Sequence, residues 1–522
     1  MNLLTTKSVI LSEVKHSLIV RNAAEGPRNS QANHNPSNHS TKASALLIAL
    51  ALAFTTLAQA QTPHPAEPWK KIPIPPLHDF KPQQPKRIEL ANGLIIFLQE
   101  DHELPFIDGT ILIRGGSRDE PAAKVGLVSL YGQTWRTSGT KTTSGDALDE
   151  TLAAKAAHVE TSGSIASTSL RWSSLKQDDD LVFGIAMDVL LHPNFNAAKL
   201  QLAKRQIETG IARRNDDAPS IAGRQAVMLG YGKDSPYARQ TQYATVDAVT
   251  LKDLDEWHTR TVVPNGIIVA VSGDFDPAAM EAKLRRAFEP LPRGETVPAL
   301  TATFTPPQPG VYFVDKPDVD QSTVFLVGLG TERGNPDFYA LSVMNYVFSG
   351  GFGSRVVQSV RTRLGLAYSV SGSFGAQYDH PGLFITEAAT KSSSTVAATR
   401  AMLDEIAKLK TVPPTPAELK SAKDQVLNSF IFNYDSPDKI LSEQVSLAFY
   451  GYPSDYLDKY KTAIEHVTSA DVSRVANKYI DGSKLAIVVV GNASEFGTPL
   501  STLGPVTPLD ITIPPPPGKP TK

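Results

Sequence analysis

The chain has 522 residues, a formal net charge of −2 and 41% hydrophobic residues, which is enough for two or three globular domains. A near-neutral charge argues against a nucleic-acid-binding protein, because such proteins normally carry a basic face. The sequence contains no cysteine, which excludes disulfides, thiolate metal sites, iron–sulfur clusters and cysteine nucleophiles.

The first recognisable element is an export signal. Residues 45–57 are almost wholly apolar and run into Ala58-Gln59-Ala60, a small-residue cleavage site. As a helix this run would rise only about 20 Å, too short for a bilayer core of roughly 30 Å. We therefore expect residues 1–60 to be removed as a leader and the protein to be exported to the periplasm, with no stable membrane anchor afterwards. Some forty polar residues precede the apolar run, so either the leader is long or translation starts further along the chain.

The rest of the chain divides by composition into two folded regions with Pro-rich flanks. Strand patterns open both regions, at 88–100 and 109–116 in the first and at 310–316 and 322–330 in the second. A helix over 195–214 places apolar residues on one face. Strands, then helices, then further strands predict an α+β fold with two homologous halves, each a sheet backed by helices. The predicted segments are a leader (1–60), a Pro-rich extended segment (61–87), an N-terminal domain (88–290), a linker (291–310), a C-terminal domain (311–497) and a Pro-rich tail (498–522).

The two halves repeat at a fixed offset of 218 residues. Thr250 and Asp253 recur as Thr468 and Asp471, and apolar positions coincide as well, with Leu254 recurring as Val472. Each copy predicts a Thr-capped helix with Asp in its first turn, followed by a β-branched strand. The shared register indicates an internal duplication.

The motifs of the N-terminal region carry a family resemblance. ANGLIIFL (91–98), IRGGSRDEP (113–121) and GLVSLYGQTWRTSGT (126–140) resemble the N-terminal half of pitrilysin/insulinase-type zinc peptidases, including mitochondrial processing peptidase. In that family the helix after the Gly-Leu carries His-x-x-Glu-His. Two His four residues apart chelate zinc from one helix face, the Glu activates the bound water, and a further Glu on a later helix completes the site.

The metal-site residues are missing from this sequence. The two His positions hold Ser129 and Gln133, and the base position holds Gly132. The later ligand position falls at Gly210, and the neighbouring Glu208 lies about 200° around the helix from it. The resemblance therefore implies that no zinc binds to this chain, with Ser129, Gly132, Gln133 and Gly210 as degenerate positions.

The remaining histidines do not replace the lost ligands. His158, His192 and His258 are isolated in sequence and are interpreted as surface or core residues. A self-contained peptidase with unusual ligands is an open but weak alternative.

The C-terminal region keeps the second family signature. LSVMNYVFSGGFGSRVVQSVRTRLGLAYSVSGSF (341–374) resembles the segment in which an Arg and a Tyr, seven residues apart, contact the substrate carbonyl. Here the resemblance implies Arg361 and Tyr368 as the residues that bind substrate and support the transition state. Guanidinium and phenol are both donors able to stabilise an oxyanion. Arg363 is a competitor with the wrong spacing, and the Gly350–Gly353 run is interpreted as a tight turn, because it lacks the phosphate-loop pattern.

Family members of this kind often work in pairs, one chain with His-x-x-Glu-His and the other with Arg and Tyr. The resemblance implies that this chain is the second kind: a non-zinc-binding subunit, inactive alone, whose homologous partner subunit carries zinc. Peptide substrate would add as a strand to a sheet edge. The alternative is a non-catalytic scaffold or peptide-binding protein derived from the same family.

The leader prediction can be tested directly. Exported protein should begin at Gln61, because the apolar run ends at the Ala58-Gln59-Ala60 site. N-terminal sequencing of the exported chain checks this, and a retained leader held in the membrane would contradict it.

Overall fold

A computed structural model of the chain describes residues 83–518. The expected leader and most of the Pro-rich segment 61–87 lie outside the described residues, so both stay predictions. Across 83–518, no helix combines the length and apolar character needed to cross a bilayer.

The N-terminal half is built on a six-stranded sheet in the order β1-β2-β6-β3-β5-β4. Only β2 and β6 run parallel; the other neighbours are antiparallel. The strands are β1 (Lys86–Glu89), β2 (Ile95–Glu100), β3 (Phe106–Arg114), β4 (His158–Gly163), β5 (Ser167–Leu175) and β6 (Ile267–Gly273). The helices are α2 (Leu127–Trp135), α3 (Gly145–Ala154), α4 (Asp179–Leu191), α5 (Ala197–Ala212), α6 (Ala218–Tyr231), α7 (Tyr243–Asp247), α8 (Leu251–Thr261) and α9 (Pro277–Phe288).

The C-terminal half repeats this plan on a seven-stranded sheet in the order β13-β7-β12-β8-β11-β10-β9. The strands β2-β6-β3-β5-β4 of the N-terminal sheet correspond one to one, in this order, to the strands β7-β12-β8-β11-β10 of the C-terminal sheet. The strands are β7 (Gly310–Asp315), β8 (Gln321–Leu329), β9 (Thr331–Glu332), β10 (Ser369–Gln377), β11 (Pro381–Lys391), β12 (Ala486–Gly491) and β13 (Val506–Pro508). The helices are α10 (Phe338–Ser349), the π-helix η6 (Val357–Arg363), α11 (Thr395–Thr411), α12 (Pro416–Asn433), α13 (Pro437–Tyr450), α14 (Tyr456–His466) and α15 (Ser469–Tyr479).

The duplication predicted from the 218-residue offset is confirmed by α8 and α15. Both helices have 11 residues, and their first residues, Leu251 and Ser469, differ by 218. Thr250 and Thr468 cap them in the same way: each hydroxyl accepts from the backbone N–H three residues on, at 3.3 and 3.2 Å. The Asp of each box accepts from the cap residue's own N–H, so the shared Thr-x-x-Asp pattern sets where both helices begin.

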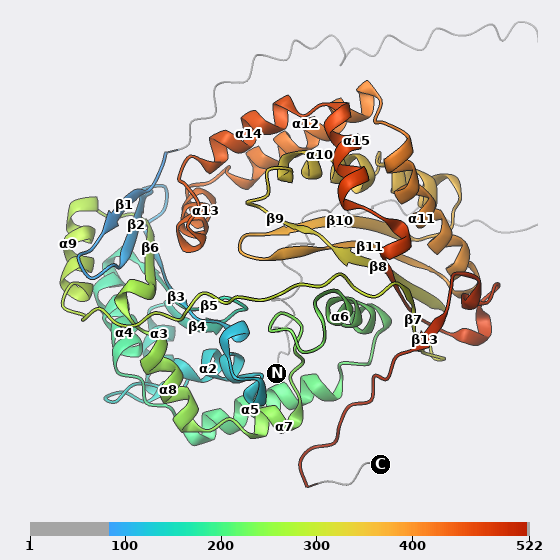
Figure 1. The fold of residues 1–522 in the computed structure, drawn as a ribbon. Helices are drawn as coiled ribbons and strands as arrows, with labels where there is room; N and C mark the ends of the chain where they lie inside the picture. Colours follow the sequence, from blue (N-terminus) through green and yellow to red (C-terminus); the bar gives the residue numbers. More distant parts are fainter. Residues whose placement is uncertain (1–82, 519–522) are drawn as a thin grey trace, which may run out of the picture. The chain divides into compact units, whose positions relative to one another are not determined.

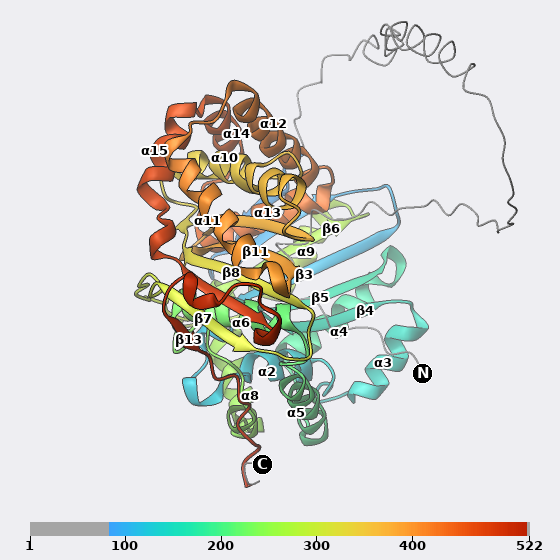
Figure 2. The same cartoon turned by 90° about the vertical axis from the view of Figure 1, so that its right-hand side faces the viewer.

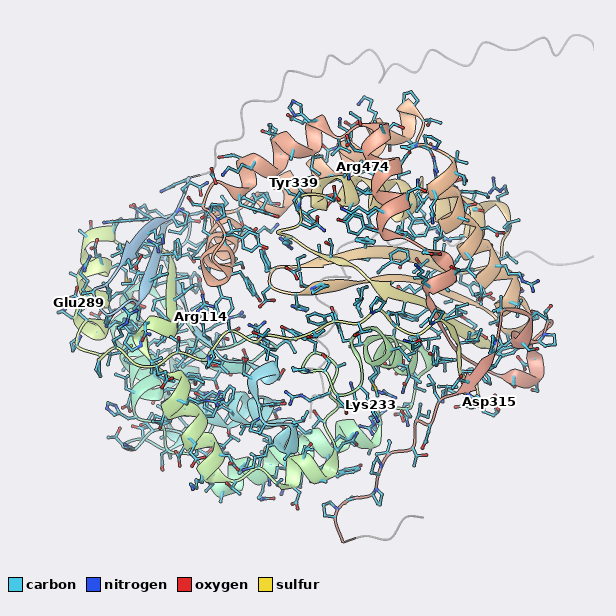
Figure 3. The ribbon with its side chains drawn as sticks, in the orientation of Figure 1. Arg114, Lys233, Glu289, Asp315, Tyr339 and Arg474 are labelled. Atoms are coloured by element: carbon cyan, nitrogen blue, oxygen red, sulfur yellow. The ribbon has the colours of Figure 1, made fainter. Side chains whose placement is uncertain are left out.

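Each half also places one helix on the sheet of the other half. The apolar face of α13, with Leu441, Val445 and Phe449, packs on β2 and β6. In return α6 packs on β8 and β12, on the face opposite to α10, α11 and α15 (Figures 1 and 2). Figure 3 labels Arg114, which ends β3. Its guanidinium carbon lies over the Phe449 ring, 4.5 Å from the ring centroid.

The ends of several predicted elements differ. The strand pattern at 88–100 is two strands, β1 and β2, and the strand expected at 109–116 is β3, which begins three residues earlier and ends two residues earlier. The expected helix at 195–214 is α5, which is shorter by two residues at each end. The segment from 498 onward, predicted as a tail, still contributes β13, which pairs in parallel with β7. Because β13 is three residues long, its strand pattern is too short to stand out in a Pro-rich sequence.

A buried histidine makes part of the fold sensitive to acid. The imidazole of His258 on α8 lies at 2.8 Å from the Tyr131 hydroxyl of α2 and edge-on to Trp135. Burial lowers the pKa of His258 to about 4. The unfolded chain therefore takes up a proton below pH 6.5 while the folded chain stays neutral down to about pH 4.

We predict that the free energy of unfolding falls by roughly 3 kcal/mol between about pH 6.5 and pH 4 because of this one group. His258→Gln should flatten that part of the profile, as measured by denaturant unfolding at stepped pH. The matched control is His158→Gln on the exposed part of β4, which should leave the profile unchanged; equal profiles for the two variants would contradict the assignment.

Candidate functional site

The helix that should carry the metal ligands is α2, and a buried carboxylate sets its start. Glu120 accepts hydrogen bonds from the backbone N–H groups of Gly126 and Val128, both at 2.9 Å. A carboxylate at a helix N-terminus satisfies orphan donors and suits the helix dipole. Burial raises the pKa of Glu120. Sequence reasoning missed this residue, although its place before a Gly-started helix was a usable signal.

The two former ligand positions on α2 now bond to each other. The amide Nε2 of Gln133 donates to Ser129 Oγ at 3.1 Å, as expected for side chains four residues apart on one helix face. A hydroxyl and a carboxamide replace two imidazoles, and neither is a ligand that zinc prefers.

The base position, Gly132, is filled from outside by the edge strand β4. A methyl group at Gly132 would lie 2.5 Å from the backbone N of Gly163 and 2.7 Å from the carbonyl carbon of Ser162. The Thr161 hydroxyl donates to the Gly132 carbonyl oxygen at 2.7 Å and fixes this approach. Helix and strand therefore touch backbone to backbone, and no side chain fits at the base position without moving β4.

The fourth position, Gly210, lies on α5 and is exposed, with no atom within 4 Å of where a methyl group would be placed. Among residues 83–518, no three His, Asp or Glu side chains come together in a group able to hold a metal ion. The residues at the family's zinc site thus do not fit zinc.

The three isolated histidines are engaged in ordinary contacts. His258 bonds to Tyr131, His192 lies 3.0 Å from the carboxylate of Asp188 on the same helix, and His158 is exposed.

In the C-terminal half, Arg361 lies near the end of the π-helix η6, and its guanidinium is exposed. Its carbon Cζ lies 5.1 Å from the centroid of the Phe352 ring, a cation–π contact. Within the described part of the chain, its N–H groups form no hydrogen bond or ion pair. Arg363 on the same turn differs, since it donates to Ser359 Oγ at 2.8 Å and lies 3.7 Å from Glu405. The structure therefore separates the two arginines that compete in the sequence.

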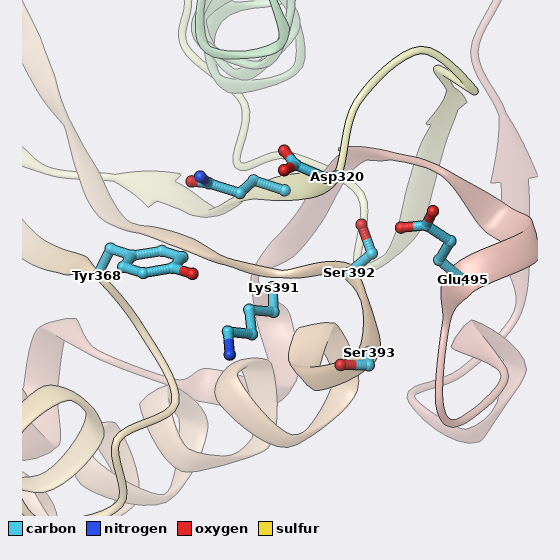
Figure 4. Close-up of a pocket in the computed structure, with 7 residues that line it drawn as sticks. Asp320, Tyr368, Lys391, Ser392, Ser393 and Glu495 are labelled. Carbon is cyan, nitrogen blue, oxygen red and sulfur yellow. The ribbon is translucent and has the colours of Figure 1, made fainter. Parts of the chain in front are cut away.

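Tyr368 directly precedes β10, and its backbone N–H donates to Ala389 O at 2.9 Å. Its side chain is 55% exposed, and over residues 83–518 its hydroxyl has no hydrogen-bond partner. The ring lines a surface cavity at the end of the C-terminal sheet (Figure 4). No contact joins the Tyr368 and Arg361 side chains in the described region, so both present free donors to an outside group.

The glycine-rich run before η6 is a tight turn, as predicted. Gly351 has a φ of 99°, and the Ser354 hydroxyl donates back to its carbonyl at 2.6 Å. Arg355 forms a two-pronged pair with Glu418 at 2.7 and 3.1 Å, which lowers the pKa of Glu418 to about 2. The turn anchors η6 and presents Phe352 to solvent.

The contrast between two glycines gives a stability test. Gly132→Ala should lower the free energy of unfolding by about 1–3 kcal/mol, because its methyl group overlaps the β4 backbone. Gly210→Ala is the control, also within a helix, in the last turn of α5, but with open space, and it should raise the free energy of unfolding by about 0.5–1 kcal/mol. Thermal and denaturant unfolding measure both, and a tolerated Gly132→Ala would show that β4 yields easily.

Comparisons with known proteins place the chain among peptidase-like relatives. Residues 248–426 match the family described as the peptidase M16 inactive domain. A Helicobacter pylori protein named non-peptidase homolog YmxG is 22% identical over 415 residues, 78% of this chain and 94% of that protein. An uncharacterized zinc protease of Rickettsia felis is 22% identical over 414 residues, 77% of this chain and 97% of that protein.

Solved structures show the same fold. The peptidase M16 inactive domain from Pseudomonas fluorescens superposes with a TM-score of 0.72 at 23% identity, over 80% of this chain and 100% of that one. A protease from Helicobacter pylori gives a TM-score of 0.69 at 19% identity, over 78% and 100%. The chain is thus similar in sequence to M16-type proteins named as zinc proteases or as a non-peptidase homologue, residues 248–426 match the M16 inactive domain, and the fold is that of solved M16-type structures.

Proposed function

We propose that this chain is the zinc-free, substrate-binding subunit of an exported two-chain metallopeptidase. It binds peptide and supplies Arg361 and Tyr368 to a homologous partner chain that holds zinc and the general base. The observation that carries the proposal is the pair of exposed, unpaired donors in the C-terminal half, set against a metal site in which Gly132 is closed by backbone.

The unpaired state of these donors supports a role outside the fold. Arg363 on the same turn is hydrogen-bonded within the chain, whereas the Arg361 guanidinium and the Tyr368 hydroxyl form no hydrogen bond or ion pair in residues 83–518. A substrate carbonyl that becomes an oxyanion would accept hydrogen bonds from both. Such donors stabilise charge that develops in the transition state.

The sheet edges support peptide binding. β4 ends the N-terminal sheet, and its counterpart β10 is covered by β9 only at Ala376 and Gln377. The remaining edge of β10 starts one residue after Tyr368. At its far end the Phe374 N–H already donates to the Asn345 amide oxygen at 2.9 Å, which leaves Ser369–Ser373 for a peptide. An extended peptide added there would gain main-chain hydrogen bonds with its backbone close to the phenol.

The partner would contribute what this chain lacks. Zinc in a three-ligand site polarises a carbonyl and lowers the pKa of a bound water. This chain would bind and orient the peptide and direct its donors at the carbonyl oxygen.

The similarity to a protein named a non-peptidase homolog favours the second candidate, a scaffold or peptide-binding protein without a catalytic role.

The test is turnover by a reconstituted pair. Arg361→Ala and Tyr368→Phe should each lower kcat by about 10²–10³, because each removes one donor to the oxyanion. Tyr368→Phe is the sharper variant, since it removes one hydroxyl and keeps the ring. A group that only held the ground-state peptide would raise KM and leave kcat unchanged.

The control is Arg363→Ala, which removes the same charge from the same turn. It should keep near-normal turnover, and metal analysis should find stoichiometric zinc in the partner and none in this chain alone. If Arg361→Ala and Tyr368→Phe both behave like Arg363→Ala, the scaffold reading replaces the shared-site proposal.

A further inference from the structure

A cavity of about 280 Å³ opens at the end of the C-terminal sheet where Tyr368 lies. It is formed by segments that follow or precede strands. Asp320 comes just before β8, and Lys391, which ends β11, pairs across the sheet with Gln321. Ser392 follows at the start of a short 3₁₀ helix, and Glu495 closes another after β12.

The floor of the cavity holds an unsatisfied polar group. Ser392 is 2% exposed, and its hydroxyl has no hydrogen-bond partner within residues 83–518. Buried hydroxyls without partners are rare because the lost solvation is not recovered. The Ser392 oxygen is directed into the space flanked by the carboxylates of Asp320 and Glu495 (Figure 4).

The charges around this floor are free. In the described part of the chain, Asp320, Glu495 and Lys391 form no ion pair, so the cavity lining has two negative charges and one positive charge. The Lys391 side chain extends away from the two carboxylates (Figure 4).

The loop that presents Glu495 is held in place by two hydrogen bonds, each between a side chain and the backbone. Asn492 Nδ2 donates to Pro317 O at 3.1 Å, and the N–H of Ala493 donates to the Asp315 carboxylate at 3.1 Å. These two bonds hold the loop that carries Glu495 at the side of the cavity.

We propose that this cavity binds an organic cation, the ammonium or guanidinium group of a peptide. Both carboxylates and the Ser392 oxygen accept N–H hydrogen bonds, and charge-assisted bonds of this kind are strong. Tyr368 lines the same cavity with its ring. The volume is several times the ~30 Å³ of one water, which suits one amino-acid side chain or a chain end. The inference deepens the proposed function and rests on it only for the peptide nature of the ligand.

The test is direct binding of peptide probes to the purified chain, measured by calorimetry at low salt. The probes are a five-residue alanine peptide with a central lysine and both ends blocked, its norleucine analogue, and pentaalanine with a free amino end. If the site takes a side-chain cation, the lysine peptide should bind at least about tenfold more tightly than the norleucine analogue. If it takes the amino end of a chain, the free-amine peptide should bind more tightly by the same factor. Equal binding of all three probes would overturn the proposal.

Variants assign the binding to this cavity. Asp320→Asn and Glu495→Gln should each weaken binding of the charged probe about tenfold or more. Ser392→Ala should weaken it too, without lowering Tm, because the hydroxyl has no partner to lose in the free chain. A drop in Tm with unchanged binding would instead show a structural role for Ser392 and overturn its part in the site.

Two further variants act as controls. Asp318 lies two residues before Asp320 but is already paired with Lys316 at 2.9 Å. The Asp318→Asn variant should therefore bind the probe normally. Lys391→Met should tighten binding because it removes a like charge; weaker binding would mean that the site takes an anion. A saturable Ca²⁺ signal that displaces the charged peptide and is lost in the same variants would replace the proposal with a metal site. Because binding is measured on this chain alone, its failure leaves the turnover test of Arg361 and Tyr368 standing.

Discussion

The central strand of each sheet is buried on both faces, and this constraint organises both halves of the chain. In β6, Ile267, Val269 and Val271 pack into the core of the N-terminal half, while Ile268 and Ala270 face the opposite side. A two-faced apolar strand needs a cover on each side, and the second cover is α13 from the other half. β12 alternates in the same way and receives α6. Burial of one Val, Leu or Ile side chain contributes about 1.5–3 kcal/mol to the stability of the fold. Because one face of each sheet is buried only by a helix from the other half, neither half completes its own core alone.

This exchange also determines which surfaces remain for function. Helices cover both faces of each sheet, so the free main-chain groups lie at the sheet edges. Two of these edges correspond between the halves: β4, and the part of β10 that β9 does not cover. In the N-terminal half, that edge is pressed against α2 by the contact between Gly132 and Gly163. In the C-terminal half, the equivalent edge begins beside Tyr368, after a π-helix that presents Arg361. The duplicated plan thus leads to different outcomes, a closed contact in one half and exposed donors in the other.

Sequence reasoning predicted the parts that depend on local pattern. The Thr-x-x-Asp boxes fixed the starts of α8 and α15, and β-branched runs fixed β6 and β12, because caps and strand periodicity are local signals. The exchange of α6 and α13 could not be predicted, since an amphipathic helix does not encode which sheet it covers. The seven-residue spacing selected Arg361 over Arg363, but only the fold shows that Arg363 is bonded to Ser359. The cavity around Ser392 escaped notice for the same reason, because its lining comes from four separate turns.

The four positions that correspond to the metal site therefore differ in the space that they leave for a larger side chain. Ser129 is exposed on α2, Gln133 is half-buried and Gly210 has open space, so a larger side chain would meet little resistance at Ser129 and Gly210. Gly132 is different, because the backbone of β4 occupies the volume that a carboxylate stem would need. A Glu at this position requires the edge strand to move, and that strand is tied to α2 by Thr161. Placing His and Glu ligands at the other three positions would thus still leave a Glu at position 132 without space, because the packing of helix on strand occupies it.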